Sequence, residues 1–298
     1  MKSKEQAFID YLLHEKYYSL HTIKAYENDL SDFAVFLKND FEEDDLVKVN
    51  YSQIRSWIVS MVDQNISAAS VNRKMASLKA FYKFLLKSKQ IDLSPLVKHK
   101  SLKTAKKIQI PFSVQEVQNV LASDVFEADF EGIRNELIVN LFYTTGVRRS
   151  ELIELKLADV DLGNRIIKVL GKRNKERVVP VVSEIIPLIK RYLEERSLLE
   201  VIQDEQLFFL TKKGKKLNIS LVYRLINGYF SNVTEKVKKS PHIMRHSFAT
   251  HLLNNGADIN SVKDLLGHSS LASTQVYTHN SLSELKKAHG AAHPRQKK

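Results

Sequence analysis

The sequence predicts a mainly α-helical protein with two domains, the second of which contains a small antiparallel sheet. Its 298 residues are enough for about two domains. Apolar residues recur at intervals of three and four along four stretches of the first 90 residues, as they do on one face of a helix. Glycine and proline number only 9 and 6, too few for a loop-rich or fibrous chain. We expect a helical domain over residues 1–90, a basic linker over 91–112 and a second domain over 113–298.

Four amphipathic helices are expected in the first domain, where each would bury its apolar face in a small bundle. Ser19 and Ser67 stand where N-caps would begin the second and fourth helices. The acidic run 40–45 is expected to be the solvated loop between the second and third helices. The four apolar faces comprise Phe8, Tyr11, Leu12 and Leu13; Ile23, Tyr26, Leu30, Phe33 and Leu37; Ile54, Trp57, Ile58 and Met61; and Val71, Met75, Leu78, Tyr82 and Leu85.

The basic residues of the chain are concentrated around the predicted linker. Lys and Arg number 46 against 34 Asp and Glu, which gives a net charge of +12. Residues 67–110 are strongly basic, and Asp92 is their only acidic residue. Lys79, Lys83 and Lys87 share one face of the fourth helix, which by itself would indicate only a solvated face. Because the same charge continues through the linker, we expect this stretch to lie along a nucleic-acid backbone.

Several classes of site are excluded by composition. The sequence has no cysteine, which excludes disulfides, thiolate metal sites and a cysteine nucleophile. No apolar run approaches the roughly 18 residues of a membrane span, so no membrane partner is expected. His246 and His251 are five residues apart and off a common helix face, so no metal site is expected there.

In the second domain we expect several helices and one β-hairpin. Ser113 and Glu116 have the spacing of a capping box at the start of its first helix. The runs 165–169 and 176–179 predict two strands joined by a basic turn, and 207–209 predicts a further short strand. The remaining helices are expected at about 131–145, 183–197, 219–232, 241–254, 259–266, 271–277 and 281–288.

One helix start in this domain has the features of a phosphate site. Ser240 at the N-cap and Pro241 at the first helical position define the start, and His242 and Arg245 follow on the first turns. The free N–H groups and positive dipole at this end of a helix suit a phosphate. In isolation, His242 and Arg245 are equally well explained as surface residues.

Four other polar residues also have ordinary structural explanations when taken singly. Arg148 follows the turn at the end of an apolar helix, where a cation complements the helix dipole. Lys172 would be an exposed lysine in the hairpin turn. His268 follows Gly267, which would be a left-handed helix stop. Tyr277, nine residues further on, would be a half-buried core tyrosine.

Taken together, two arginines, a lysine, two histidines and a tyrosine are what phosphoryl transfer to a tyrosine requires. Arg148 and Arg245 can bind the equatorial oxygens of the transition state bidentately. A phenol with a free pKa of about 10 needs such a positive field, or a base, in order to attack near neutral pH. A lysine on the hairpin can protonate the leaving alkoxide. Because guanidinium groups carry the charge, this chemistry needs neither a metal ion nor another cofactor.

Five spaced motifs resemble those of the tyrosine recombinase (phage integrase) family, and most closely the bacterial Xer subgroup. The resemblance covers essentially the whole chain and includes the ending Ala292-His293-Pro294-Arg295. It implies the tyrosine recombinase fold, in which a four-helix core-binding (SAM-like) domain precedes a catalytic domain with a C-terminal subunit-exchange tail. The motifs are Thr145-Gly146-Val147-Arg148-Arg149-Ser150-Glu151-Leu152, Gly171-Lys172, the run from His242 to Leu252, Leu266-Gly267-His268 and Tyr277-Thr278-His279.

The resemblance implies a site-specific recombinase that needs neither metal nor ATP. Tyr277 would be the nucleophile, forming a 3′-phosphotyrosyl link and releasing a 5′-hydroxyl. His242 would assist removal of the proton from Tyr277, and Lys172 would be the general acid toward the leaving 5′-oxygen. The energy of the broken phosphodiester bond would be retained in the protein–DNA ester.

Arg148, Arg245 and His268 would hold the scissile phosphate by the same resemblance. Arg149 and Arg173 depart from the family pattern, which has an apolar residue and a glycine just after the two catalytic positions. Arg173 would make the hairpin tip stiffer and more basic. The expected DNA contacts are Arg73, Lys74, Lys79, Lys83, Lys87, Lys103, Lys106, Lys107, Arg149, Arg173 and Lys175.

The resemblance also implies partners and a cellular role. Family members form a cyclic tetramer on two double-stranded DNA core sites, either with copies of themselves or with a sister recombinase. The two domains would clamp the duplex, and a helix over 281–292 would dock on a neighbouring subunit. We expect a cytoplasmic, nucleoid-associated bacterial protein that resolves chromosome dimers at cell division, with a septal DNA translocase of FtsK type as a further partner.

Three alternatives compete with this interpretation. An integrase of a mobile element shares the chemistry, but such integrases often carry an extra N-terminal arm-binding domain, whereas this chain starts directly with the core-binding bundle. A type IB topoisomerase would relax supercoils without site-specific exchange. A catalytically silent DNA-binding protein would have a damaged constellation, whereas all six positions are present here.

Overall fold

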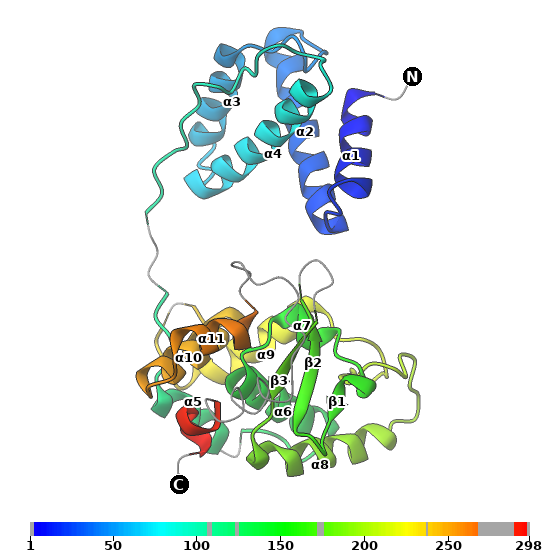
Figure 1. Ribbon diagram of the computed structural model, residues 1–298, viewed down its shortest axis with the longest axis vertical. Coiled ribbons are helices and arrows are strands. Elements are labelled where there is room, and N and C mark those ends of the chain that lie inside the picture. Colours follow the sequence, from blue (N-terminus) through cyan, green and yellow to red (C-terminus); the bar gives the residue numbers. More distant parts are fainter. Residues whose placement is uncertain are drawn as a thin grey trace. The chain divides into compact units, whose positions relative to one another are not determined.

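The computed structural model describes residues 3–105, 109–122, 125–171, 176–236, 238–267 and 289–296. The chain divides into two compact units, Met1–Lys107 and Ile108–Lys298 (Figure 1). Each unit has its own hydrophobic core. The mainly α-helical fold class with a small antiparallel sheet is confirmed.

The described part of the first unit contains four helices, as predicted. Ser19 and Ser67 cap the second and fourth helices, and each side-chain oxygen accepts a backbone N–H three residues later at 3.3 Å. Phe8, Phe33 and Phe81 are fully buried among the aliphatic residues of the four apolar faces. The helices are α1 (Lys4–His14), α2 (Leu20–Phe41), α3 (Tyr51–Asp63) and α4 (Ala68–Lys87).

A buried carboxylate links α2 to α4 in this unit. Asp29 is 1% exposed and accepts hydrogen bonds from Arg73 at 2.8 Å, Ser77 at 2.7 Å and Lys74 at 3.2 Å. Lys74 also pairs with the exposed Asp32 at 2.6 Å. Burial alone would raise the pKa of Asp29, but the hydrogen bonds from Arg73, Ser77 and Lys74 lower it. Asp29 therefore stays charged and fixes the positions of two cationic side chains.

The second unit surrounds one central helix. Most side chains of α6 (Phe130–Thr145) are buried, and α6 packs against both α8 and α10. In the three-stranded sheet, β2 pairs antiparallel with both β1 and β3 (Figure 1). The other helices are α5 (Val114–Ala122), α7 (Arg149–Ile153), α8 (Ile186–Ser197), α9 (Ile219–Ser231), α10 (Pro241–Asn254) and α11 (Ile259–Leu266), and the strands are β1 (Val160–Asp161), β2 (Ile166–Leu170) and β3 (Glu176–Pro180).

Two details of this unit differ from the sequence prediction. Residues 207–209 do not form a strand of the sheet, since Leu207 makes only an isolated bridge to Lys156. Phe208 and Phe209 are both fully buried, so the apolar run that predicted a strand is a core segment. The third strand is β1, whose two residues are too few to give a periodic signal. The expected helices at 271–277 and 281–288 lie outside the described residues.

Replacing Asp29 by alanine should destabilise the first unit by about 2–3 kcal/mol, because Lys74 and Arg73 would lose their shared anionic partner. Trp57 is the only tryptophan of the chain, and the Lys74 ammonium lies 5.9 Å from its ring centre. Urea unfolding of the full chain followed by tryptophan fluorescence therefore reports on this unit. Asp32→Ala is the matched control, and an equal loss for both variants would refute the assigned role of Asp29.

Candidate active site

The turn that carries Arg148 is fixed by a glycine. Gly146 ends α6 in the left-handed conformation, with φ of 59°. A Cβ atom at this position would lie 2.3 Å from the ring of Phe248, so a side chain is excluded by space as well as by conformation. Val147 is buried behind the turn, and Arg148 follows as the N-cap residue of α7. The sequence Gly-Val-Arg thus places the guanidinium group at a defined position.

A buried carboxylate anchors Arg148. Glu151, on the first turn of α7, accepts the backbone N–H of Arg148 at 2.7 Å and a guanidinium N–H of Arg148 at 2.7 Å. Arg177 of β3 donates to both oxygens of the same carboxylate, at 2.6 and 2.8 Å. Burial alone would raise the pKa of Glu151, but Arg177 and then Arg148 lower it to about 2. Glu151 is therefore an anion shared by two arginines at neutral pH.

Arg245 reaches the same place from α10. Its side chain is 7% exposed and donates to the backbone carbonyls of Gly146 and Leu266. Burial, together with repulsion from Arg148 and Arg177, lowers the pKa of Arg245 to about 9. The guanidinium group thus remains charged at neutral pH, and its partners among the described residues are neutral carbonyls rather than a carboxylate.

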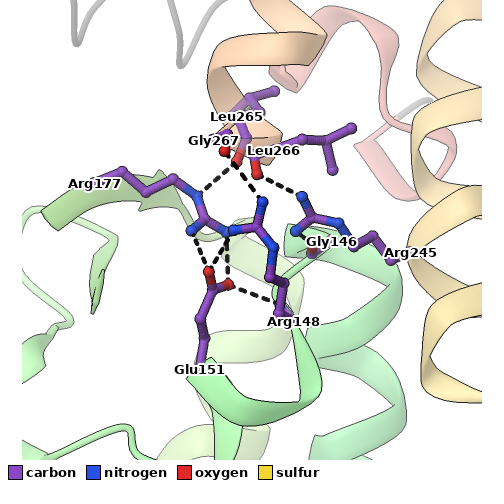
Figure 2. Close-up of polar contacts among 8 residues, drawn as sticks. All are labelled: Gly146, Arg148, Glu151, Arg177, Arg245, Leu265, Leu266 and Gly267. Atoms are coloured by element: carbon purple, nitrogen blue, oxygen red, sulfur yellow. Dashed lines mark hydrogen bonds and ion pairs between the residues drawn. The ribbon is translucent and has the colours of Figure 1, made fainter. Parts of the chain in front are cut away.

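The three guanidinium groups converge on the carboxyl end of α11 (Figure 2). Arg177 Nε donates to Leu265 O at 3.0 Å, Arg148 donates to Gly267 O at 3.1 Å, and Arg245 donates to Leu266 O. Carbonyls at a helix end are partly negative, which favours cations there. The ordinary explanation of Arg148, a cation that complements the dipole of the preceding helix α6, does not hold, because the helix end that Arg148 contacts belongs to α11.

His242 lies at the start of α10, as predicted. Ser240 caps this helix, Pro241 is its first residue, and the imidazole of His242 is exposed. Burial on one side and then the nearby positive charges of Arg245, His246 and Lys238 lower the pKa of His242. The imidazole is therefore neutral near pH 7, which is the form that can accept a proton.

The described residues bring together Arg148, Arg245 and His242 of the six predicted catalytic positions. The other three, Lys172, His268 and Tyr277, lie outside the described residues, so their roles stay predictions. Four of the expected DNA contacts also lie outside the described residues: Lys106, Lys107, Arg173 and Lys175. Four others are exposed, namely Lys79, Lys83, Lys87 and Lys103, and Arg149 is half-buried. The remaining two, Arg73 and Lys74, pair with Asp29.

Two residues of the site were not predicted from the sequence. The spacing of three residues between Arg148 and Glu151 is that of a helical ion pair, and it is the signal that could have found Glu151. Arg177 shares the inward face of β3 with Val179, so it is a charged residue in a core position of an alternating strand. A charged residue at a position of a strand where the alternating pattern predicts a buried apolar residue is the signal that could have identified Arg177.

The site can bind an anion with two or more guanidinium groups, as a phosphodiester requires. Across the described ranges, no group of three or more His, Cys, Asp or Glu residues is placed to hold a metal ion. Nor does any helix in these ranges have the length and apolar character needed to cross a bilayer.

Comparison with known proteins gives the family. Residues 113–284 match the Phage integrase family, and residues 6–89 match the Phage integrase, N-terminal SAM-like domain. A tyrosine recombinase XerC of Chlorobaculum parvum (strain DSM 263 / NCIMB 8327) is 36% identical over 314 residues, 97% of this chain and 94% of that protein. One of Myxococcus xanthus is 38% identical over 294 residues, 97% of each.

The chain belongs to the phage integrase family of tyrosine recombinases. This membership confirms the activity predicted from the sequence, the site-specific breakage and rejoining of DNA. A solved structure of XerH site-specific recombinase bound to difH substrate, a pre-cleavage complex, is similar in fold to this tyrosine recombinase, with a TM-score of 0.66 and 26% identity. The match covers 89% of this chain and 79% of that one.

The C-terminal segment of this recombinase packs on its own catalytic unit. His289 Nε2 donates to Thr144 O at 2.6 Å, and His293 Nε2 donates to Tyr143 O at 3.1 Å. Both imidazoles are almost fully buried. The segment therefore covers the end of α6, just before the turn that carries Arg148. The expected docking of the 281–292 helix on a neighbouring subunit stays a prediction, since 281–288 lie outside the described residues.

Acid should detach this segment. Burial lowers the pKa of His289, and burial followed by the charge of His289 lowers that of His293 to about 3, against an ordinary value of 6.5. Both docked imidazoles are neutral, so the stability they contribute is complete above pH 6.5. Below pH 6.5 the undocked form takes up protons more readily than the docked form, so docking weakens as the pH falls. For His293, whose docked pKa is about 3, the loss is about 1.4 kcal/mol per pH unit. Amide hydrogen exchange of residues 289–296 should therefore lose protection between pH 7 and pH 5.

The matched control for this experiment is the variant His289→Gln/His293→Gln, which should show the same protection at both pH values. Wild-type protection that is unchanged between pH 7 and pH 5 would contradict the assigned neutral, docked state of the two imidazoles.

Proposed function

We propose that this tyrosine recombinase is of the Xer type and resolves chromosome dimers at cell division by recombining a specific core site in duplex DNA. The observation that carries the proposal is the convergence of Arg148 and Arg245 on the carboxyl end of α11. Two charged guanidinium groups and a neutral His242 are what activation of a phosphodiester by a protein nucleophile needs. The similarity to proteins named XerC, over nearly the full length of both chains, supports the choice of the Xer type over an integrase of a mobile element.

In the proposed reaction, the phenol oxygen of Tyr277 attacks the scissile phosphorus, and the P–O5′ bond breaks. The proton of the phenol passes to His242, and the leaving 5′-oxygen takes a proton from Lys172, giving a 5′-hydroxyl and a 3′-phosphotyrosyl ester. Arg148, Arg245 and His268 hold the non-bridging oxygens. A 5′-hydroxyl of the partner strand then attacks the ester, so exchange conserves the number of phosphodiester bonds and needs no external energy source.

In this proposal both domains bind the DNA. The core-binding domain 1–90, the linker 91–112 and the catalytic domain 113–298 would each contact the DNA backbone. Lys79, Lys83 and Lys87 are exposed on α4, which supports contact with phosphates. Arg73 and Lys74 would reach phosphates while Asp29 fixes their side chains.

The proposed assembly is a cyclic tetramer on two DNA sites, formed by copies of this chain or with a sister recombinase. We include a septal DNA translocase of FtsK type as a partner and a cytoplasmic, nucleoid-associated location, since both follow from the proposed role in chromosome segregation. A recombinase complex bound to its DNA among the structural relatives supports the DNA partner.

The variant Tyr277→Phe should bind DNA with unchanged affinity and form no covalent adduct. It lacks only the hydroxyl that would attack phosphorus, so recombination should fall below detection. The measurement is denaturing gel electrophoresis after incubation with a nicked suicide duplex, with wild type and the conservative variant Tyr223→Phe, on the exposed face of α9, as controls. An adduct that persists in Tyr277→Phe would assign the nucleophile to another residue.

The variant Lys172→Ala should cleave an ordinary duplex about 100-fold more slowly or worse, because the leaving alkoxide would lack its acid. A duplex with sulfur in place of the bridging 5′-oxygen has a leaving group that needs no proton, so it should restore cleavage to within about tenfold of wild type. Equal defects on both duplexes would show that Lys172 is not the general acid.

A further inference from the structure

Arg177 is a buried cation that no step of the proposed reaction uses. Its side chain is 6% exposed and makes three hydrogen bonds to two partners in the site. Two of them go to the oxygens of Glu151, and the third goes from Nε to Leu265 O. A buried guanidinium group is costly unless it is fully paired, so its placement calls for a reason beyond packing.

Charge balance around Glu151 supplies one reason. Glu151 is 2% exposed and is shared between Arg148 and Arg177, so two cations face one buried anion. The group of three therefore keeps one net positive charge for a ligand. With Arg177 replaced by a neutral residue, Arg148 would be the only cation hydrogen-bonded to the carboxylate among the described residues. Glu151 would then cancel the charge of Arg148 and hold its guanidinium group away from a phosphate.

Geometry at the end of α11 supplies a second reason. Arg177 Nε binds the carbonyl of Leu265, and the Arg177 side chain lies against Gly267. A Cβ atom on Gly267 would be 2.9 Å from Arg177 Cδ, so the left-handed stop of α11 and the arginine fit one another closely. His268 is the next residue of the chain. Arg177 thus links the strand β3, the helix α7 through Glu151, and the end of α11 (Figure 2).

We propose that Arg177 is a positioning residue of this recombinase. By sharing Glu151 it keeps Arg148 available to the scissile phosphate, and its hydrogen bond to Leu265 O holds the Arg177 guanidinium group in the place from which it does so. The proposal rests on the proposed function, because it assigns Arg177 a part in holding the scissile phosphate. It predicts that the need for Arg177 in cleavage depends on the charge of Glu151, whereas a purely structural role would lower unfolding temperature and half-site binding along with cleavage.

The test measures the rate of covalent adduct formation on a nicked duplex that carries the core site on which the wild-type chain forms its adduct. Four full-length variants are compared with wild type: Arg177→Met, Glu151→Gln, the double variant, and Lys190→Met as a control that removes an exposed charge on α8. Calorimetric unfolding and binding to a single half-site are measured in parallel, so that a loss of fold is separated from a loss of cleavage.

Arg177→Met should slow cleavage about 10–100-fold, the range for residues that orient a ligand-binding group. In the Glu151→Gln background, the same change should cost less than about threefold, because no carboxylate remains to cancel Arg148. Lys190→Met should cleave like wild type. If Arg177→Met does not fold, the cleavage rate of the double variant relative to that of Glu151→Gln still tests the proposal.

A double variant that cleaves more than about threefold more slowly than Glu151→Gln, or that does not fold, would overturn the proposal. So would an Arg177→Met variant that cleaves like wild type. Failure of the proposed function is a separate result, since the wild-type chain would then form no adduct on any candidate core site.

Discussion

Three guanidinium groups of like charge lie together in the catalytic unit, and oxygen acceptors fixed by the backbone hold them there. Glu151 is shared by Arg148 and Arg177, and the carbonyls at the end of α11 receive all three arginines. Mutual repulsion would otherwise drive these side chains apart. The three guanidinium groups have one carboxylate among them, so the site keeps a net positive charge that a phosphate can bind, and every step assigned to the enzyme depends on it.

Local sequence features place the three arginines on separate elements that meet at this point. A left-handed glycine ends α6 before Arg148, and another ends α11 where the carbonyls are exposed to the site. Arg245 follows the capped start of α10, which also carries His242. Each of these helix stops and caps is determined by residues that are close together in the sequence. The central position of α6, packed against α8 and α10, aligns these short elements with one another.

Much of the fold was predictable because helices have clear sequence signals, namely the periodicity of apolar residues and the residues that cap the helix ends. The N-caps Ser19, Ser67 and Ser240 and the left-handed stop at Gly267 are all confirmed. The prediction of a strand at 207–209 was wrong because a run of buried apolar residues has the same sequence pattern in a strand and in an irregular core segment.

The site was predictable only in part, for a different reason. A motif gives residue types, whereas partners come from tertiary packing. Nothing in the sequence around Arg148 shows that its carbonyl partner comes from α11 rather than α6. The role of Arg177 was not predicted because its contacts with Glu151 and with the end of α11 form only in the folded structure. The six catalytic positions came from combining residues that have ordinary explanations singly, and Tyr277, Lys172 and His268 keep the status of predictions.

The most direct test of the arginine site is to remove the charge it is built to hold. A duplex with a neutral methylphosphonate at the scissile position should form the covalent adduct with Arg148→Ala and Arg245→Ala at least tenfold faster than an ordinary phosphodiester duplex does. Arginine variants that fail equally on both duplexes, while still binding DNA, would contradict the claim that these guanidinium groups act by carrying the phosphate charge.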